Sequence, residues 1–98
     1  MIVLFTDFGL EGPYIGQVKA RILMQAPGAT IIDLFSDAPV HNPKACSYLL
    51  AAYAEAFPSG AIFLAVVDPG VGSNRAGMAV EAGGRWFVGP DNGLFEMA

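Results

Sequence analysis

Short apolar runs alternate with helical periodicities along this chain of 98 residues. The runs predict three strands, at 2–5, 30–35 and 61–67, and the stretches between them predict helices. Two successive strand–helix–strand units imply parallel strands joined by right-handed crossovers. A hairpin follows, with strands at 78–82 and 85–88 around Gly83-Gly84. The predicted fold is therefore α/β: a mainly parallel sheet built from two βαβ units, with helices on its faces and a following β-hairpin.

Both helices carry signals at their ends. Pro13 suits the first turn of a helix, and Pro27-Gly28 ends one. Asn42-Pro43 is typical of an N-cap followed by the first helical residue, and Pro58-Ser59-Gly60 stops the second helix. One apolar stripe recurs at helical spacing on each helix: Ile15, Val18 and Ile22 on the first, and Cys46, Leu49, Leu50, Tyr53 and Phe57 on the second.

Polar residues follow each of the three strands. Asp7 ends the first, Ser36-Asp37 the second, and Asp68 the third. Because the carboxyl ends of parallel strands lie along one edge, these residues are expected to line the edge where open α/β sheets bind ligands. After Asp68, a proline and two glycines return the chain to Arg75. An acid and a base held there are costly to desolvate unless they pair or bind something.

Each of these residues also has a structural interpretation. Asp68 and Arg75 can form a salt bridge that pins a loop. Asp7 can be a turn or cap residue, or a carboxylate that accepts hydrogen bonds from a ribose diol. His41, the one histidine, can be a surface residue. The glycines at 70–75 are not a dinucleotide fingerprint, because the sequence after them predicts a strand where that motif needs a helix.

The composition is unusually apolar for so small a domain. Hydrophobic residues make up 54% and charged residues 14%, with a mean hydropathy of +0.50. We therefore expect another domain or subunit to cover part of the surface. A net charge of −4 argues against nucleic-acid binding, and one cysteine argues against a cysteine-based metal site. The sequence shows neither an 18-residue apolar span nor a signal peptide, so we expect no membrane partner and a cytoplasmic location.

Three segments resemble a known family. They are Phe5-Thr6-Asp7-Phe8-Gly9, the stretch from Val66 through Asp68-Pro69-Gly70-Val71-Gly72 to Arg75, and Gly89-Pro90-Asp91-Asn92-Gly93-Leu94. Their order and approximate spacing are similar to those of the S-adenosyl-L-methionine (SAM) hydroxide adenosyltransferases, which are SAM hydrolases related to fluorinase and chlorinase. The resemblance covers essentially the whole chain, and the Asp68-to-Arg75 motif is its most specific part.

The resemblance implies that water or hydroxide attacks C5′ of SAM, giving adenosine and L-methionine without a metal or other cofactor. Asp68 and Arg75 would belong to a catalytic, water-holding Asp/Arg/His triad. Asp7 would hold the ribose hydroxyls with Phe8 nearby. His41 falls where relatives often carry an aromatic residue, so it would lie against the nucleoside instead of completing the triad.

The resemblance also implies parts that these residues do not contain. The family histidine lies beyond Ala98, and a C-terminal β-barrel supplies most adenine contacts across the interface of a homotrimer. Residues 1–98 would thus be a partial N-terminal domain, inactive alone. A halide-dependent SAM halogenase is the nearest alternative, although Asp68 would repel a halide. A non-catalytic adenosine or SAM binding module and a purely structural domain are the others.

Overall fold

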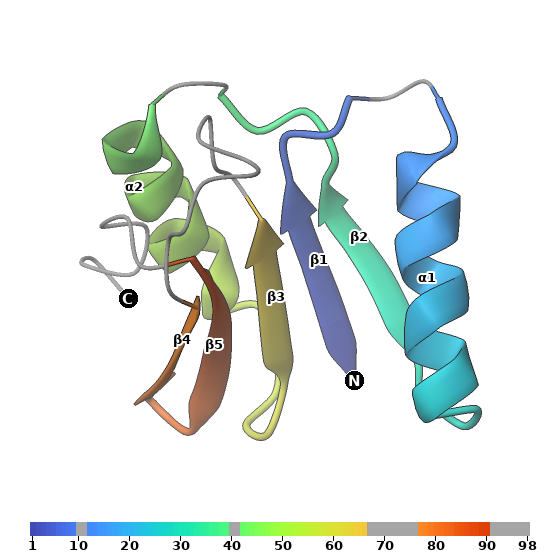
Figure 1. Ribbon diagram of the computed structural model, residues 1–98. Helices are drawn as coiled ribbons and strands as arrows, with labels where there is room; N and C mark the ends of the chain where they lie inside the picture. Colours follow the sequence, from blue (N-terminus) through green and yellow to red (C-terminus); the bar gives the residue numbers. More distant parts are fainter. Residues whose placement is uncertain (10–11, 40–41, 67–76, 91–98) are drawn as a thin grey trace.

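The computed structural model describes residues 1–9, 12–39, 42–66 and 77–90, which form five strands and two helices (Figure 1). The elements are β1 (Ile2–Thr6), α1 (Tyr14–Gln25), β2 (Ile31–Phe35), α2 (Pro43–Ala54), β3 (Ile62–Val66), β4 (Gly77–Ala82) and β5 (Arg85–Pro90). This confirms the predicted element order and the hairpin. The sheet has the strand order β2-β1-β3-β5-β4.

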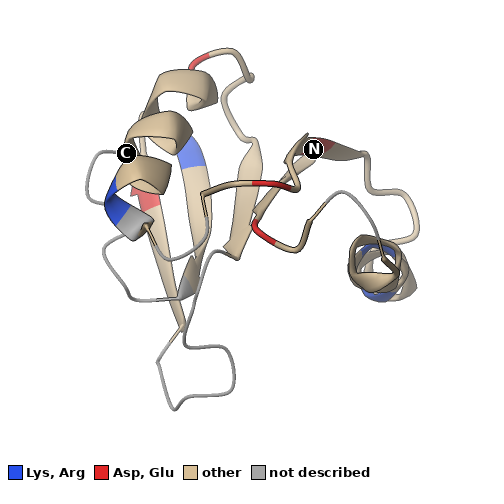
Figure 2. Cartoon of the chain, turned by 90° about the horizontal axis from the view of Figure 1, so that it is seen from above, with Lys and Arg blue, Asp and Glu red and all other residues tan. Residues whose placement is uncertain are grey.

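Parallel pairing dominates the sheet, as predicted. β1 lies between β2 and β3 and is parallel to both, and β5 is parallel to β3. Among these five strands only β4 is antiparallel to its neighbour, because a tight turn joins it to β5. The chain moves from β1 to β2 on one side and then back across to β3 on the other. With right-handed crossovers, this reversal places α1 and α2 on opposite faces of the sheet (Figure 2).

The core lies between the sheet and α2. Its buried side chains come from alternate strand positions, which point to one face. They are Val3 and Phe5 on β1, Phe63 and Ala65 on β3, Phe87 on β5, and Cys46 and Leu50 on α2. The rings of Phe63 and Phe87 stack with centroids 5.0 Å apart. Side chains distant in sequence thus join both βαβ units and the hairpin in one core.

The second helix differs from its prediction at the carboxyl end. The Asn42 side chain accepts a hydrogen bond from the Ala45 N–H at 3.1 Å, which confirms the predicted N-cap. The helix, however, ends at Ala54, before Phe57. Phe57 still reaches the core from the following turn, where its ring packs edge-on against Phe63 at 5.3 Å. The apolar periodicity correctly predicted the packing of Cys46, Leu49, Leu50 and Phe57, but Tyr53 is 47% exposed and the helix is shorter than predicted.

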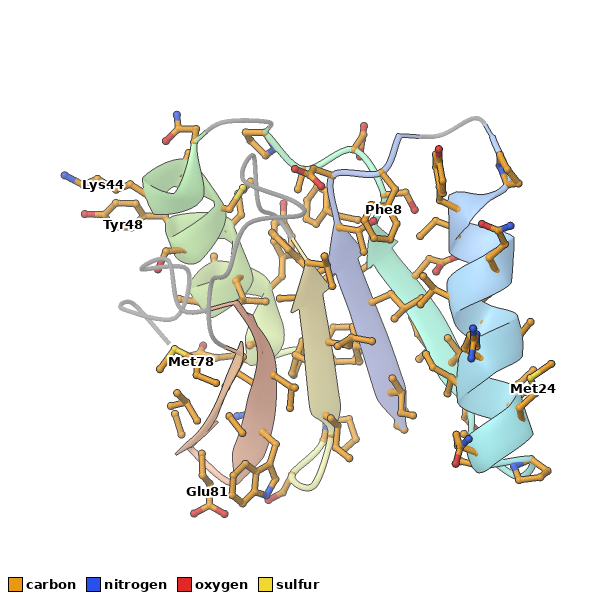
Figure 3. The ribbon with its side chains drawn as sticks, in the orientation of Figure 1. Phe8, Met24, Lys44, Tyr48, Met78 and Glu81 are labelled. Atoms are coloured by element: carbon orange, nitrogen blue, oxygen red, sulfur yellow. The ribbon has the colours of Figure 1, made fainter. Side chains whose placement is uncertain are left out.

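The first helix is loosely packed. It begins and ends where proline predicted, yet none of its residues is buried. Leu23 is 41% and Met24 74% exposed, and Met24 points away from the sheet (Figure 3). An ion pair of 2.6 Å between Lys19 and Asp33 joins α1 to β2. The exposed apolar side chains are consistent with a covered surface, which stays a prediction.

An arginine fastens the hairpin to the end of α2. The Arg85 guanidinium donates to the Phe57 carbonyl through Nε at 2.9 Å and Nη2 at 2.6 Å. It also reaches the carbonyls of Glu55 at 3.5 Å and Gly83 at 3.3 Å. A cation is favourable near the C-terminal end of a helix, because the unsatisfied carbonyls there carry partial negative charge. Arg85 therefore stabilises the packing of β4–β5 against α2.

Candidate functional site

The strand order defines a switch point at the carboxyl edge of the sheet. From β1 the chain continues through α1 on one face, whereas α2 leads to β3 on the other. The carboxyl ends of β1 and β3 are therefore the place where an open α/β sheet offers a crevice for ligands. In the parallel register, Thr6 at the end of β1 pairs with Val66 at the end of β3. Asp7 immediately follows this pair.

Backbone hydrogen bonds hold Asp7 between two neighbouring strands. Its N–H donates to the Val66 carbonyl on β3 at 3.3 Å. On the other side, the Thr6 carbonyl accepts from the Ala38 N–H at 3.0 Å, and the Gly9 N–H donates to the Ser36 carbonyl at 2.6 Å. The loop after β1 is thus joined to both the end of β3 and the loop after β2. The position of Asp7 follows from strand pairing rather than from a flexible loop.

A bulge separates the ends of β1 and β2. The register between them shifts between Leu4 and Phe5, so that Leu4 faces Asp33 and Phe5 faces Phe35. The buried Thr6 hydroxyl donates to the Phe35 carbonyl at 3.5 Å, a long bond across the strands. Bulges bend a strand and are common next to functional sites. The register shift here lies just before the acidic edge.

The amino end of α2 reaches the same edge. The buried Cys46 thiol donates to the Pro39 carbonyl at 3.2 Å. Burial raises the pKa of the Cys46 thiol, and the nearby negative charge of Asp7 raises it further. The loop after β2 therefore connects the end of β1, next to Asp7, to the first turn of α2. Because the thiol stays protonated, it is a hydrogen-bond donor to the loop rather than a nucleophile.

Phe8 lies beside Asp7 at the carboxyl ends of β1 and β2 (Figure 3). Its partly buried ring is tilted by 58° against that of Tyr14, the first residue of α1, with centroids 6.4 Å apart. Tyr14 is 62% exposed. Sequence reasoning missed Tyr14, although its place one residue after the helix-starting Pro13 would have put it at this edge.

The edge is acidic. Asp7 follows β1 and Asp37 follows β2, and Figure 2, which looks down on this edge, shows acidic segments in both loops.

Within residues 1–9, 12–39, 42–66 and 77–90, no group of three or more His, Cys, Asp or Glu side chains is arranged to hold a metal ion. In the same ranges no helix is long and apolar enough to cross a bilayer.

The structure thus brings Asp7 and Phe8 together, with Tyr14 and Cys46 beside them. The predicted site residues Asp68, Arg75 and His41 lie outside the described residues, and their roles stay predictions. A separate hollow lies between the end of α2 and the β4–β5 hairpin, lined by Ala51, Ala54, Glu55, Ala82, Gly83, Arg85 and Phe87. Neither Asp7 nor Phe8, the two predicted site residues that the structure describes, lines it.

Asp7 thus lies at the switch point of a three-layer α/β domain, the edge at which open α/β sheets commonly bind small ligands. The family model of the SAM hydroxide adenosyltransferase N-terminal domain matches residues 2–98. The chain belongs to this family, as the motifs in its sequence indicated.

The chain is similar to several known proteins. It is 47% identical over 98 residues to (R)-S-adenosyl-L-methionine hydrolase of Thermus thermophilus, covering 99% of this chain and 38% of the relative. It is 39% identical to the protein of the same name from Methanocaldococcus jannaschii, covering 97% of this chain and 38% of that one. The chain thus spans well under half the length of these curated relatives.

Solved structures agree with the fold. A conserved hypothetical protein from Thermus thermophilus superimposes with a TM-score of 0.85 at 44% identity, over 98% of this chain and 40% of the other. An uncharacterized conserved protein from Thermotoga maritima gives 0.90 at 38% identity, over 97% and 36% respectively. The fold described here is therefore that of the matching portion of larger proteins.

Proposed function

We propose that the protein hydrolyses SAM to adenosine and L-methionine. The single observation that carries this proposal is the family match across residues 2–98, together with relatives named (R)-S-adenosyl-L-methionine hydrolase. The position of Asp7 at the switch point supports it, because a carboxylate there can accept hydrogen bonds from both hydroxyls of a ribose. Phe8 and His41 would lie against the nucleoside.

In the proposed reaction, the oxygen of water forms a bond to C5′ of SAM while the C5′–S bond breaks. The sulfur keeps the bonding electron pair, so methionine leaves as a neutral thioether, and the attacking water releases one proton to the solvent. Because a sulfonium is already a good leaving group, the protein must mainly position and polarise the water in line with that bond. Asp68 and Arg75 would hold it. We propose no metal or redox cofactor, since neither bond change needs one.

The remaining parts of the proposal concern the larger protein. Residues 1–98 would be part of the N-terminal domain, and a C-terminal β-barrel and a further histidine would complete the site. A homotrimer would bring the barrel of one subunit to the site of the next. The exposed Leu23 and Met24 on α1 support a covered surface of this kind. We propose a cytoplasmic location, where SAM is available.

Chromatography of SAM incubated with the protein at its full encoded length tests the reaction. We expect adenosine and methionine in equal amounts, with or without added chloride or fluoride. A halogenated nucleoside formed only with halide would instead identify a halogenase. SAM that binds tightly and stays intact would favour the binding module.

Three substitutions test the residue roles in the same protein. Asp68→Ala and Arg75→Ala should each abolish adenosine release. Full activity in either variant would overturn its catalytic role. Asp7→Ala should mainly weaken the binding of SAM and adenosine, measured by calorimetry. Unchanged affinity for both ligands would show that Asp7 is only a turn residue at the end of β1.

A further inference from the structure

The rings of Phe8 and Tyr14 form an aromatic pair beside the acidic edge. Their centroids are 6.4 Å apart and their planes meet at 58°, so they form two walls of a corner. The aromatic rings in the core lie closer together: the ring centroids of Phe63 and Phe87 are 5.0 Å apart. Tyr14 is 62% exposed, so the core does not use most of its surface.

Charge and aromatic surface coincide at this corner. Phe8 directly follows Asp7, and Asp37 lies in the neighbouring loop, which is joined to Gly9 through the Ser36 carbonyl. An aromatic face attracts a cation through its quadrupole, and carboxylates nearby favour the same charge. The best ligand for such a corner is a cation that is itself weakly hydrated and partly apolar. An alkyl sulfonium fits this description better than an ammonium does.

We infer that Tyr14, together with Phe8, recognises the sulfonium of the substrate and makes the site prefer the charged substrate over neutral adenosyl compounds. This inference rests on the proposed function, since it takes a SAM-type sulfonium as the ligand. Asp7 would hold the ribose. Phe8, one residue further along, would lie against the nucleoside at its C5′ end, and Tyr14 beside it would face the sulfur attached to C5′. Tyr14 is then a residue that determines specificity.

The test compares two ligands that differ only at sulfur, by one methyl group and the positive charge that comes with it. SAM carries a sulfonium, whereas S-adenosylhomocysteine lacks the methyl group and has a neutral thioether. Calorimetry on the full-length protein, carrying Asp68→Ala to prevent turnover, gives both dissociation constants. Tyr14→Leu should weaken SAM binding about 2- to 30-fold, the usual range for a cation–π contact, and leave the neutral ligand within about 2-fold. Tyr14→Phe should keep the preference.

Tyr48→Leu is the matched control. Tyr48 is a 54% exposed tyrosine on α2, pointing outward far from Phe8 (Figure 3), and its loss should change neither constant. The inference would be overturned if Tyr14→Leu raised the dissociation constants of SAM and S-adenosylhomocysteine equally, or changed neither of them. It would also be overturned if neither ligand bound the protein that carries Asp68→Ala alone. The proposed function fails separately: the protein without Asp68→Ala would then release no adenosine, while the charge preference still stands.

Discussion

The turn of the β4–β5 hairpin offers a sharp test of the structure. Gly83 and Gly84 have φ of +59° and +79°, as a type I′ turn requires at both central positions. A Cβ on Gly84 would lie 2.5 Å from the Ser59 Oγ, whereas one on Gly83 would meet nothing closer than the Arg85 Nη1 at 3.5 Å. Gly84→Ala should therefore destabilise the protein more than Gly83→Ala.

The magnitude follows from two contributions. An alanine with left-handed φ costs about 1–2 kcal/mol at either position, so this part is shared. At Gly84 the Ser59 side chain must also rotate away and lose its 3.4 Å hydrogen bond to the Gly84 carbonyl, which adds about 1 kcal/mol. We expect Gly84→Ala to lower the free energy of unfolding by about 2–3 kcal/mol and Gly83→Ala by about 1–2 kcal/mol.

Urea unfolding followed by circular dichroism measures these differences, and a double-mutant cycle isolates the clash. Ser59→Ala removes the Oγ and leaves its Cβ at 3.6 Å, an ordinary contact distance. Combined with Gly84→Ala, it should recover about 1 kcal/mol relative to additivity. Equal effects of the two glycine substitutions, or a strictly additive double variant, would refute the proposed contact between the turn and Ser59.

Two further predictions concern the partly buried Arg85 and the buried Cys46. Arg85→Met should lower the free energy of unfolding by about 2 kcal/mol, because the carbonyls of Glu55 and Phe57 lose a charged donor. Arg85→Lys should lower it by about half of that. An unchanged urea midpoint for Arg85→Met would contradict this role of Arg85. For Cys46, the raised pKa means that the unfolded thiol deprotonates first, above about pH 8.5. The contribution of the protonated thiol to stability is therefore complete below that pH and is lost as pH rises towards the folded-state pKa. In the same assay, the free energy of unfolding of Cys46→Ala should fall less steeply above about pH 8.5 than that of the unsubstituted protein. Parallel pH profiles of the two proteins would show that burial does not suppress ionisation of Cys46.

Local patterns in the sequence were sufficient for the order and type of the elements. Strand and helix periodicities, Asn42 as an N-cap and the glycine pair of the hairpin act over a few residues, so they can be read without tertiary contacts. The same holds for Asp7, because a polar residue after an apolar run marks the end of a buried strand. The family motifs then identified the chain, which comparison with known proteins supports.

Tertiary structure decided what long-range packing controls. The order β2-β1-β3-β5-β4 depends on which strand edges pair, and this order makes the ends of β1 and β3 the switch point. The closeness of Asp7 to Cys46 and the pairing of Phe8 with Tyr14 arise where different elements meet. Phe57 lies beyond the end of α2, and its ring packs against Phe63 from the following turn. Sequence periodicity reports which residues share a face, whereas only the folded chain determines which faces and strand ends come together.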